Sequence, residues 1–182
     1  MTIATLMTYL LQAMAAWVPP AQQPEGTDKA VARYQSIARD IATIALDEAQ
    51  NPLFAGTDGR EKTALLVASI ASFESFYRAD VDEGRSRGDH GGSFCLMQIQ
   101  VGNGKTPEGW TGPELVATRS KCLMAGLNRI RESFSMCRTL PQAFRLSGYT
   151  SGRCTQEPKA EARMNRATRW LASHPVLADS GS

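Results

Sequence analysis

The chain has 182 residues, 42% of them hydrophobic and 21% charged, and a formal net charge of +2. A chain of this length and composition can bury a sizeable core without a metal or many crosslinks, which predicts one globular domain over residues 1–182. The small charge argues against a nucleic-acid-binding protein, because such domains carry clustered and much stronger positive charge. It is compatible with approach to an anionic surface such as a bacterial cell wall.

Residues 1–20 begin the chain with an apolar segment. Its apolar side chains recur at the spacing of an amphipathic helix that ends at Pro19 and Pro20. No Lys or Arg precedes them, as would be usual in a secretory signal. A helix packed on the domain is the favoured interpretation, and an uncleaved export signal of an unusual kind is the alternative. No later segment is long and apolar enough to predict a stable membrane span.

Four further segments carry apolar residues at helical spacing: residues 30–50, 60–77, 120–137 and 157–173. The second of them begins with a capping box, in which Asp58 is the N-cap and Glu61 the acid at the third position. Residues 80–92 are polar and rich in glycine, which predicts a loop, and residues 93–101 are predicted as a short strand. The expected fold is mainly α, with a small β-sheet beside the second of these helices and a C-terminal helix at the end.

Glu74 is a carboxylate inside the apolar run 70–77, where Phe73 and Phe76 lie close to it in sequence. Burial among aromatic rings would raise the pKa of such a carboxyl. An acid that keeps its proton near neutral pH can donate it to a leaving oxygen, so Glu74 is the candidate catalytic acid. The alternative is an ordinary residue on a helix surface, paired with Arg78 four positions later.

A glycine-led apolar segment follows at residues 91–99 and carries one amide side chain, Gln98. In a strand, Gln98 would face the opposite side from Met97 and Ile99. An amide both donates and accepts hydrogen bonds, which suits a sugar hydroxyl or acetamido group. The alternative is an ordinary polar position on a half-exposed strand. Together with Glu74, this segment points to carbohydrate chemistry.

Most glycosidases place two carboxylates at the scissile bond. Here Asp82 and Asp89 lie in the polar loop, and only Glu74 has an apolar setting. This asymmetry favours a mechanism with a single carboxylate, in which the N-acetyl group of the substrate stabilises the charge at the anomeric carbon. In a later loop, Trp110 could stack on a sugar ring, although a loop tryptophan more often fills a local core.

Three motifs occur in order, namely Glu74-Ser75, Gly92-x-x-x-Leu96-Met97-Gln98-Ile99 and Tyr149-x-x-Gly152. This arrangement resembles the catalytic domain of the soluble lytic transglycosylases, which belongs to the lysozyme-like superfamily. The resemblance covers residues 61–154. It departs from the family pattern at Cys95, where a glycine is usual, and at Thr150, where an asparagine is usual.

The resemblance implies a lysozyme-like α+β fold with its catalytic core over residues 58–154. It assigns the roles of acid and base to Glu74, and roles beside the substrate to four more residues, Ser75, Met97, Gln98 and Tyr149. The implied activity is non-hydrolytic cleavage of the bond between N-acetylmuramic acid and N-acetylglucosamine in peptidoglycan, with a 1,6-anhydro product. No metal or organic cofactor is implied, and peptidoglycan glycan strands would be the partner of a monomeric enzyme.

Two other functions stay open. A muramidase of the same fold would hydrolyse the bond with water, which Asp82 or Asp89 would orient. A non-catalytic glycan-binding or virion structural module would keep the fold without the activity. The setting is open between the cell envelope or periplasm, the extracellular space and a phage virion. The basic stripe of Arg163, Arg166 and Arg169 is expected to be a solvated helix face.

The chain has four cysteines, Cys95, Cys122, Cys137 and Cys154. They lack the close Cys-x-x-Cys spacing of a zinc site, so no metal site is expected. An even number predicts two disulfides in an oxidising compartment, and the preferred pairing joins Cys95 to Cys122 and Cys137 to Cys154. The first bond would tie the strand to the following helix, and the second would tie the end of that helix to the loop that carries Tyr149. The alternative is four buried thiols.

Overall fold

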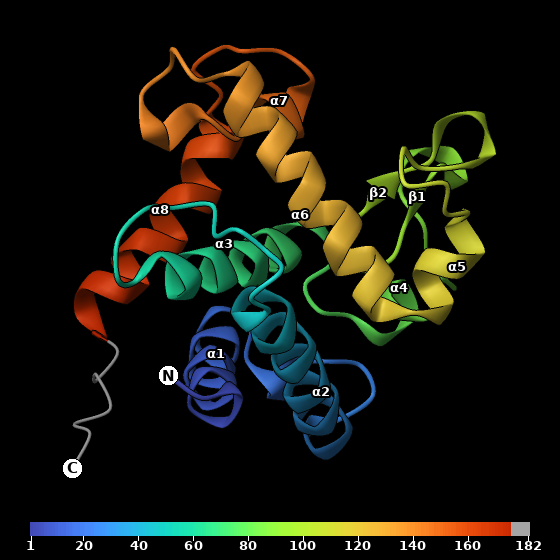
Figure 1. Cartoon of the computed structure of the whole chain (residues 1–182). Coiled ribbons are helices and arrows are strands. Elements are labelled where there is room, and N and C mark those ends of the chain that lie inside the picture. The colour runs from blue at the N-terminus through green and yellow to red at the C-terminus, as the bar shows by residue number, and fades with distance from the viewer. Residues whose placement is uncertain (176–182) are drawn as a thin grey trace.

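The computed structural model describes residues 1–175. This part of the chain is mainly helical, with a small antiparallel sheet of two strands (Figure 1). The α-helices are α1 (Ile3–Trp17), α2 (Thr27–Leu46), α3 (Gly59–Glu74), α4 (Ala79–Asp82), α5 (Gly112–Ala117), α6 (Arg119–Met136), α7 (Ser147–Ser151) and α8 (Pro158–Ser173). The strands are β1 (Ser93–Phe94) and β2 (Ile99–Gln100), and short 3-10 helices lie at Pro20–Gln22, Asp89–Gly91, Gly102–Gly104 and Gln142–Phe144. Within residues 1–175, no helix has the length and apolar character needed to cross a membrane.

Helix α3 runs through the middle of the molecule and contacts α8, α2, α1 and α6 (Figure 1). Its residues from Thr63 to Ser72 are all buried. Most of them are alanine or aliphatic, and a helix that is apolar all round is stable when other elements surround it. The last residue of α3 is Glu74, so the most enclosed helix of the fold carries this carboxyl to its end.

Helix α1 packs on α2 and α3. Leu6, Leu10 and Met14 are fully buried along one of its faces, and Tyr9 Oη donates a hydrogen bond to the His174 carbonyl at 2.7 Å. Burial of each such apolar side chain contributes about 1.5–3 kcal/mol. The favoured interpretation of this segment, a helix packed on the domain, is confirmed.

Helix α3 begins directly after Asp58, as predicted, but the predicted capping box does not form and the helix ends early. Asp58 makes no side-chain cap bond, and its carboxylate pairs with Lys62 at 2.8 Å. The backbone of Asp58, at φ −99° and ψ 14°, lies outside the extended region that a capping residue adopts. The helix ends at Glu74 rather than three residues later, because Phe76 and Tyr77 have positive φ values of 52° and 51°.

The single strand predicted over residues 93–101 is wrong, because this segment forms a hairpin. Strand β1 pairs antiparallel with β2, and the chain reverses between Phe94 and Ile99. In this turn Cys95 and Gln98 have positive φ values of 61° and 46°. Gln98 therefore lies in a turn, where the alternation of side chains expected for a strand does not apply.

The turn of the hairpin packs directly against α6. Cys95 forms a disulfide with Cys122 of α6, and Met97 is fully buried against Gly126, four residues further along that helix. A Cβ atom on Gly126 would lie 2.7 Å from Met97 Cε, closer than side chains approach one another. The glycine therefore leaves the space that Met97 fills.

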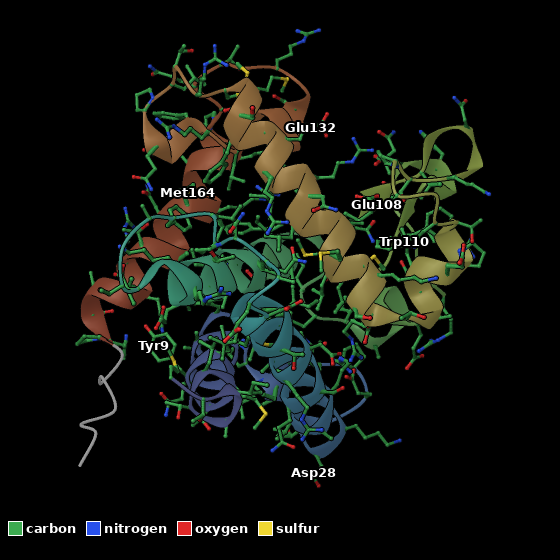
Figure 2. All side chains as sticks on the ribbon, viewed as in Figure 1. Tyr9, Asp28, Glu108, Trp110, Glu132 and Met164 are labelled. Atoms are coloured by element: carbon green, nitrogen blue, oxygen red, sulfur yellow. A yellow bond between two sulfur atoms is a disulfide. The ribbon has the colours of Figure 1, made fainter. Side chains whose placement is uncertain are left out.

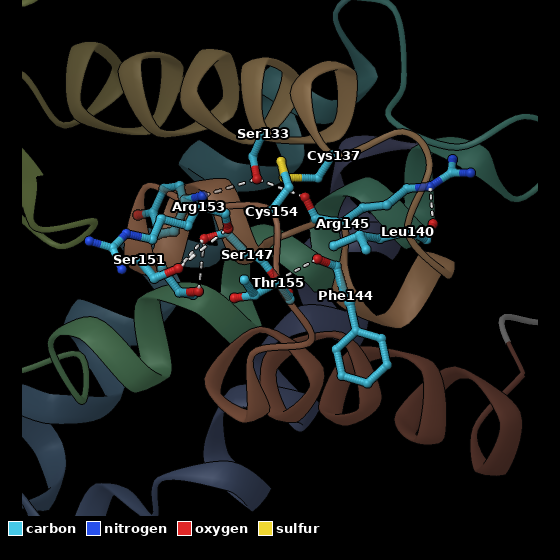
Figure 3. Close-up of a disulfide and its surroundings, with 12 residues drawn as sticks. Ser133, Cys137, Leu140, Phe144, Arg145, Ser147, Ser151, Arg153, Cys154 and Thr155 are labelled. Carbon is cyan, nitrogen blue, oxygen red and sulfur yellow. Dashed lines mark hydrogen bonds between the residues drawn. A yellow bond between two sulfur atoms is a disulfide. The ribbon is translucent and has the colours of Figure 1, made fainter.

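The second disulfide joins Cys137, just after α6, to Cys154, just after α7 (Figure 3). Both disulfides join the pairs that the sequence favoured. The paired cysteines are 27 and 17 residues apart in the chain. Closing loops of such lengths stabilises a fold by about 3 kcal/mol each in the chain-entropy view. The hairpin turn and α7 are thus both crosslinked to the same helix.

Candidate active site

Glu74 forms an ion pair between α3 and α8. Its side chain keeps 21% of its surface exposed, against 10% for Arg163 of α8. Arg163 donates to Glu74 Oε1 from Nη2, at 2.7 Å, and from Nε, at 3.1 Å. Arg78, the partner expected if Glu74 were an ordinary surface residue, instead pairs with Asp80. Glu74 is therefore a partly buried carboxylate with a partner from the far end of the sequence.

The dry aromatic surroundings predicted for Glu74 are wrong. Phe76 is 58% exposed, and the Phe73 ring lies beneath two guanidinium groups, with Arg163 at 4.8 Å and Arg166 at 3.9 Å from its centroid. A cation over an aromatic face is an attractive contact. Arg163 is only 8% exposed, so the expectation of a solvated basic stripe is wrong for it as well. Helix α8 gives the site a cationic wall.

Tyr149 comes from α7, which forms where the sequence predicts a loop. Its Oη donates a hydrogen bond to the Met97 carbonyl at 2.7 Å. Burial, and then the negative charge of Glu74, raise the pKa of Tyr149 far above its ordinary value. The phenol therefore stays protonated and lies within electrostatic reach of Glu74. A hydrogen bond thus joins the Tyr149 motif on α7 to the Met97 motif in the hairpin turn.

Gln98 and Ser75 use their polar atoms to hold the local backbone. Gln98 accepts a hydrogen bond from the Gly88 N–H at Oε1 and donates one from Nε2 to the Cys95 carbonyl, both at 2.9 Å. Ser75 is 2% exposed, and its Oγ donates to the Ala71 carbonyl at 2.8 Å. The structure gives both side chains a structural role, and their roles beside a substrate stay predictions.

The other candidate carboxylates are bonded elsewhere. Asp82 accepts two hydrogen bonds from Arg119 of α6, at 2.6 and 3.1 Å. Asp89 accepts one from Ser93 Oγ at 2.5 Å. Neither contacts Glu74 through a hydrogen bond. Both carboxylates serve the packing of the segment that links α3 to the hairpin.

Trp110 lies beside the hairpin, on the far side of α6 from α8 (Figure 2). Its ring is partly buried against the core, and Lys121 Nζ lies 5.7 Å from the ring centroid. Trp110 therefore lies away from α8, the helix that carries Arg163. The contacts fit the interpretation of Trp110 as a residue that fills a local core.

A strained turn directly follows Glu74 and Ser75. Phe76 and Tyr77 have φ near +50°, a region that costs a non-glycine residue about 1–3 kcal/mol. Three side chains hold this turn: Gln23 Nε2 donates to the Phe76 carbonyl at 2.9 Å, Arg33 Nε donates to the Tyr77 carbonyl at 2.7 Å, and Ser75 Oγ accepts from the Tyr77 N–H at 3.2 Å. Strain of this kind clusters at functional sites. Neither residue is Gly or Asn, so this left-handed turn could not be predicted from the residue types.

Within residues 1–175, no group of three or more His, Cys, Asp or Glu side chains is placed to hold a metal ion. Comparison of the chain with protein-family models, with curated proteins and with solved structures finds no match. The case for a function therefore depends on the chemistry of the Glu74 site.

Proposed function

We propose that this protein cleaves peptidoglycan glycan strands as a lytic transglycosylase, with Glu74 as its acid and base. One observation carries the proposal: Tyr149 bonds to the Met97 carbonyl at 2.7 Å and lies within electrostatic reach of Glu74, although the three residues come from segments far apart in the chain. The resemblance to the lytic transglycosylases requires this meeting. Three unrelated motifs would have no reason to converge on one carboxyl.

In the proposed reaction, Glu74 Oε2 faces the glycosidic oxygen. Both Arg163 bonds go to Oε1, and Oε2 makes no hydrogen bond within residues 1–175. Protonated Glu74 gives its proton to the leaving oxygen as the glycosidic bond breaks, while the acetamido oxygen of the substrate stabilises the anomeric carbon. The carboxylate then takes the proton of the 6-hydroxyl of the same sugar. The oxygen of that hydroxyl bonds to the anomeric carbon and closes the 1,6-anhydro ring.

Arg163 is the positioning residue in this proposal. Two charge-assisted hydrogen bonds hold the ionised carboxylate, which is the form that Glu74 has when it acts as base. The acid step needs a proton on Oε2, and Oε1 can still accept a hydrogen bond from Arg163 in that form.

The hydrolytic alternative needs a group that orients a water molecule. Asp82 and Asp89 are the candidates for this role, and they are bonded to Arg119 and Ser93 instead. With a single carboxylate at the site, the 6-hydroxyl of the sugar is the nucleophile that the substrate itself supplies. This favours the anhydro product.

A non-catalytic glycan-binding module is the second candidate, and the contact between Glu74 and Arg163 favours it. A carboxylate held by an arginine side chain that is only 10% exposed is also what a structural ion pair between α3 and α8 would look like. Removing one partner of a buried pair is strongly destabilising. The stability that this ion pair supplies would by itself explain why position 74 carries an acid.

Cleavage of purified cell walls by the wild type and Glu74→Gln separates the two candidates. Glutamine has nearly the same shape and can accept a hydrogen bond from Arg163, but it cannot transfer a proton. We expect the wild type to lower the turbidity of the walls, and Glu74→Gln to do so at least about 100-fold more slowly. Glu132→Gln is the matched control, because Glu132 is an exposed carboxylate on α6 (Figure 2).

Thermal unfolding of each variant shows whether it is folded before its rate is compared. Equal clearing by the wild type and a folded Glu74→Gln variant would remove Glu74 from the reaction. A wild type that binds walls tightly and releases no sugar would decide for the binding module.

A further inference from the structure

A groove beside the Glu74 site takes no part in the proposed reaction. It has a volume of about 660 Å³, and its lining comes from α8, from Trp17 at the end of α1 and from Phe73 of α3. Its α8 residues extend from Pro158 to Ser173, a stretch of helix about 23 Å long. We call this hollow the α8 groove.

Two cations line the α8 groove without a carboxylate partner. Arg166 bonds to the neutral hydroxyl of Ser72 at 2.6 Å, and Arg169 is exposed to solvent. Neither makes an ion pair with another residue of the described chain, and burial lowers the pKa of Arg166. Glu161 is the one acidic side chain in the described lining. The groove therefore carries an excess of positive charge, which is complementary to an anionic ligand.

Aromatic rings supply the apolar part of the groove. Trp17 and Trp170 meet edge to face with their centroids 5.9 Å apart, while His174 stacks on one face of Trp170 and two guanidinium groups cover the Phe73 ring. Large aromatic surfaces favour contact with flat apolar faces such as the C–H face of a sugar ring, while arginine forks favour carboxylates. A groove that offers both groups side by side suits an acidic carbohydrate.

The groove meets the Glu74 site at the Phe73 ring. Arg166, which lines the groove, lies 3.9 Å from the ring centroid, and Arg163, which holds Glu74, lies 4.8 Å from it. One aromatic residue thus separates the two places. A long ligand in the groove would continue towards Glu74.

We propose that the α8 groove binds an acidic, carboxylate-bearing stretch of the glycan strand next to the bond that Glu74 cleaves. Arg166 and Arg169 bind the carboxylates, and Trp17 and Trp170 contact the sugar rings. The identity of the strand as peptidoglycan rests on the proposed function. The choice of an acidic carbohydrate rests on the charges and rings of the groove itself.

Equilibrium binding of a soluble, peptide-free glycan strand from cell walls tests this proposal. The strand is used with its carboxylates intact and after they have been converted to neutral methyl amides. The protein carries Glu74→Gln so that no strand is cut, and tryptophan fluorescence reports the binding. Within that protein, Arg169→Gln should weaken binding of the acidic strand about fivefold. Arg39→Gln, which changes an exposed arginine of α2, is the matched control and should leave binding unchanged.

Adding Arg166→Gln to Arg169→Gln should bring the total loss to more than about tenfold. The neutral strand should bind at this weaker level even without these changes. Arg169 makes no side-chain hydrogen bond within residues 1–175, so Arg169→Gln should keep the unfolding temperature of its parent. This lets a weaker affinity be attributed to the groove.

Three outcomes overturn the proposal: Arg169→Gln and Arg39→Gln bind alike, the neutral strand binds as tightly as the acidic one, or the strand does not bind. The groove and the cleavage reaction can also fail separately. If the wild type leaves cell walls intact while Arg169→Gln weakens binding of the acidic strand, the binding proposal is supported and the cleavage proposal is refuted. If the wild type cuts walls and Arg169→Gln binds normally, the groove alone is refuted.

Discussion

Two arginines bind carboxylates across helix interfaces, and their arrangements differ. Arg119 of α6 donates to both oxygens of Asp82, at 3.1 and 2.6 Å, and also to Asp40 of α2, at 2.7 Å. Arg163 of α8 donates two bonds to a single oxygen of Glu74. The first arrangement links three helices and bonds both oxygens of Asp82, and the second links two helices and leaves Glu74 Oε2 without a hydrogen bond in the described structure.

The difference separates a structural network from a site that can still bind something. Burial lowers the pKa of Arg119, but its bonds to Asp82 and Asp40 outweigh this effect and raise it above the usual value. In that network both oxygens of Asp82 accept a bond from Arg119, and Asp40 accepts one at Oδ2. Glu74 instead has one oxygen without a hydrogen bond in the described structure, two residues before a strained turn, and we propose that a substrate completes the bonding there.

Arg119→Gln should have the largest effect on stability. It leaves Asp82, whose side chain is 10% exposed, without its cation, and we expect the free energy of unfolding to fall by about 3 kcal/mol. Cleavage per folded molecule should not change. Urea unfolding and a wall-clearing assay measure the two quantities. A loss of cleavage in the folded variant would mean that this network also takes part in the reaction and does not differ from Glu74 in this respect.

Replacing Cys137 and Cys154 together by serine should cost about 2–3 kcal/mol of unfolding free energy, because a loop of 17 residues is no longer closed. The same bond fastens α7, which carries Tyr149, so amide exchange in α7 should become faster than in α1. Hydrogen exchange with mass spectrometry measures this. Equal protection of α7 with and without the bond would mean that Tyr149 does not depend on it.

Arg163→Gln should lower kcat about tenfold while KM stays within twofold, since in the proposed reaction Arg163 positions Glu74 and does not bind the substrate. Arg163→Lys should restore part of the loss, because it keeps the charge but not the fork of two donors. Steady-state kinetics on soluble glycan strands gives both constants. A raised KM with unchanged kcat would instead make Arg163 a residue that binds substrate.

The smallest effect concerns two tyrosines. Burial, and then the charge of Glu61, raise the pKa of Tyr9 from 10.0 to about 12, and Glu74 adds to the raised pKa of Tyr149. Glu74→Gln removes a negative charge, so Tyr149 should ionise at a lower pH while Tyr9 does not change. Ultraviolet titration, with Tyr9→Phe and Tyr149→Phe to assign the steps, measures both. Unchanged ionisation of Tyr149 would mean that Glu74 is not close to it.

The raised pKa of Tyr9 also predicts how the free energy of unfolding depends on pH. A tyrosine whose pKa is higher in the folded than in the unfolded chain stabilises the fold. Its contribution is complete below pH 10, where the tyrosine is protonated in both the folded and the unfolded chain. That contribution is lost as pH rises from about 10, where the unfolded chain ionises, to about 12 for Tyr9. Unfolding by urea at pH 9 and pH 11 should show a lower free energy at the higher pH, and less so in Tyr9→Phe.

The long helices could be predicted because their apolar spacing is local. The segment 120–137 corresponds to α6 and the segment 157–173 to α8, and both were predicted within one residue of their ends. Residues 30–50 gave α2 with its start and end shifted by three and four residues towards the N-terminus. The hairpin was missed because two strands of two residues and their turn have the same composition as one buried strand. The left-handed backbone of Cys95 and Gln98 has no residue signature.

The candidate site was predictable only in part, for a physical reason. The motifs identified Glu74, Met97 and Tyr149, which the fold brings together. The partner of Glu74 is 89 residues away, and only the packing of α8 on α3 places Arg163 there. A single sequence shows that α8 is amphipathic but not which of its residues meets α3. Its basic residues therefore looked like a solvated face.

Mass spectrometry of the sugars released from one preparation of cell walls, by the wild type and by folded Glu74→Gln, tests the central claim most directly. The proposed reaction predicts fragments that end in a 1,6-anhydro sugar from the wild type, and none above background from the variant. Fragments with a reducing end would contradict the transglycosylase reaction. Anhydro fragments in equal amounts from both proteins would contradict the role of Glu74 itself.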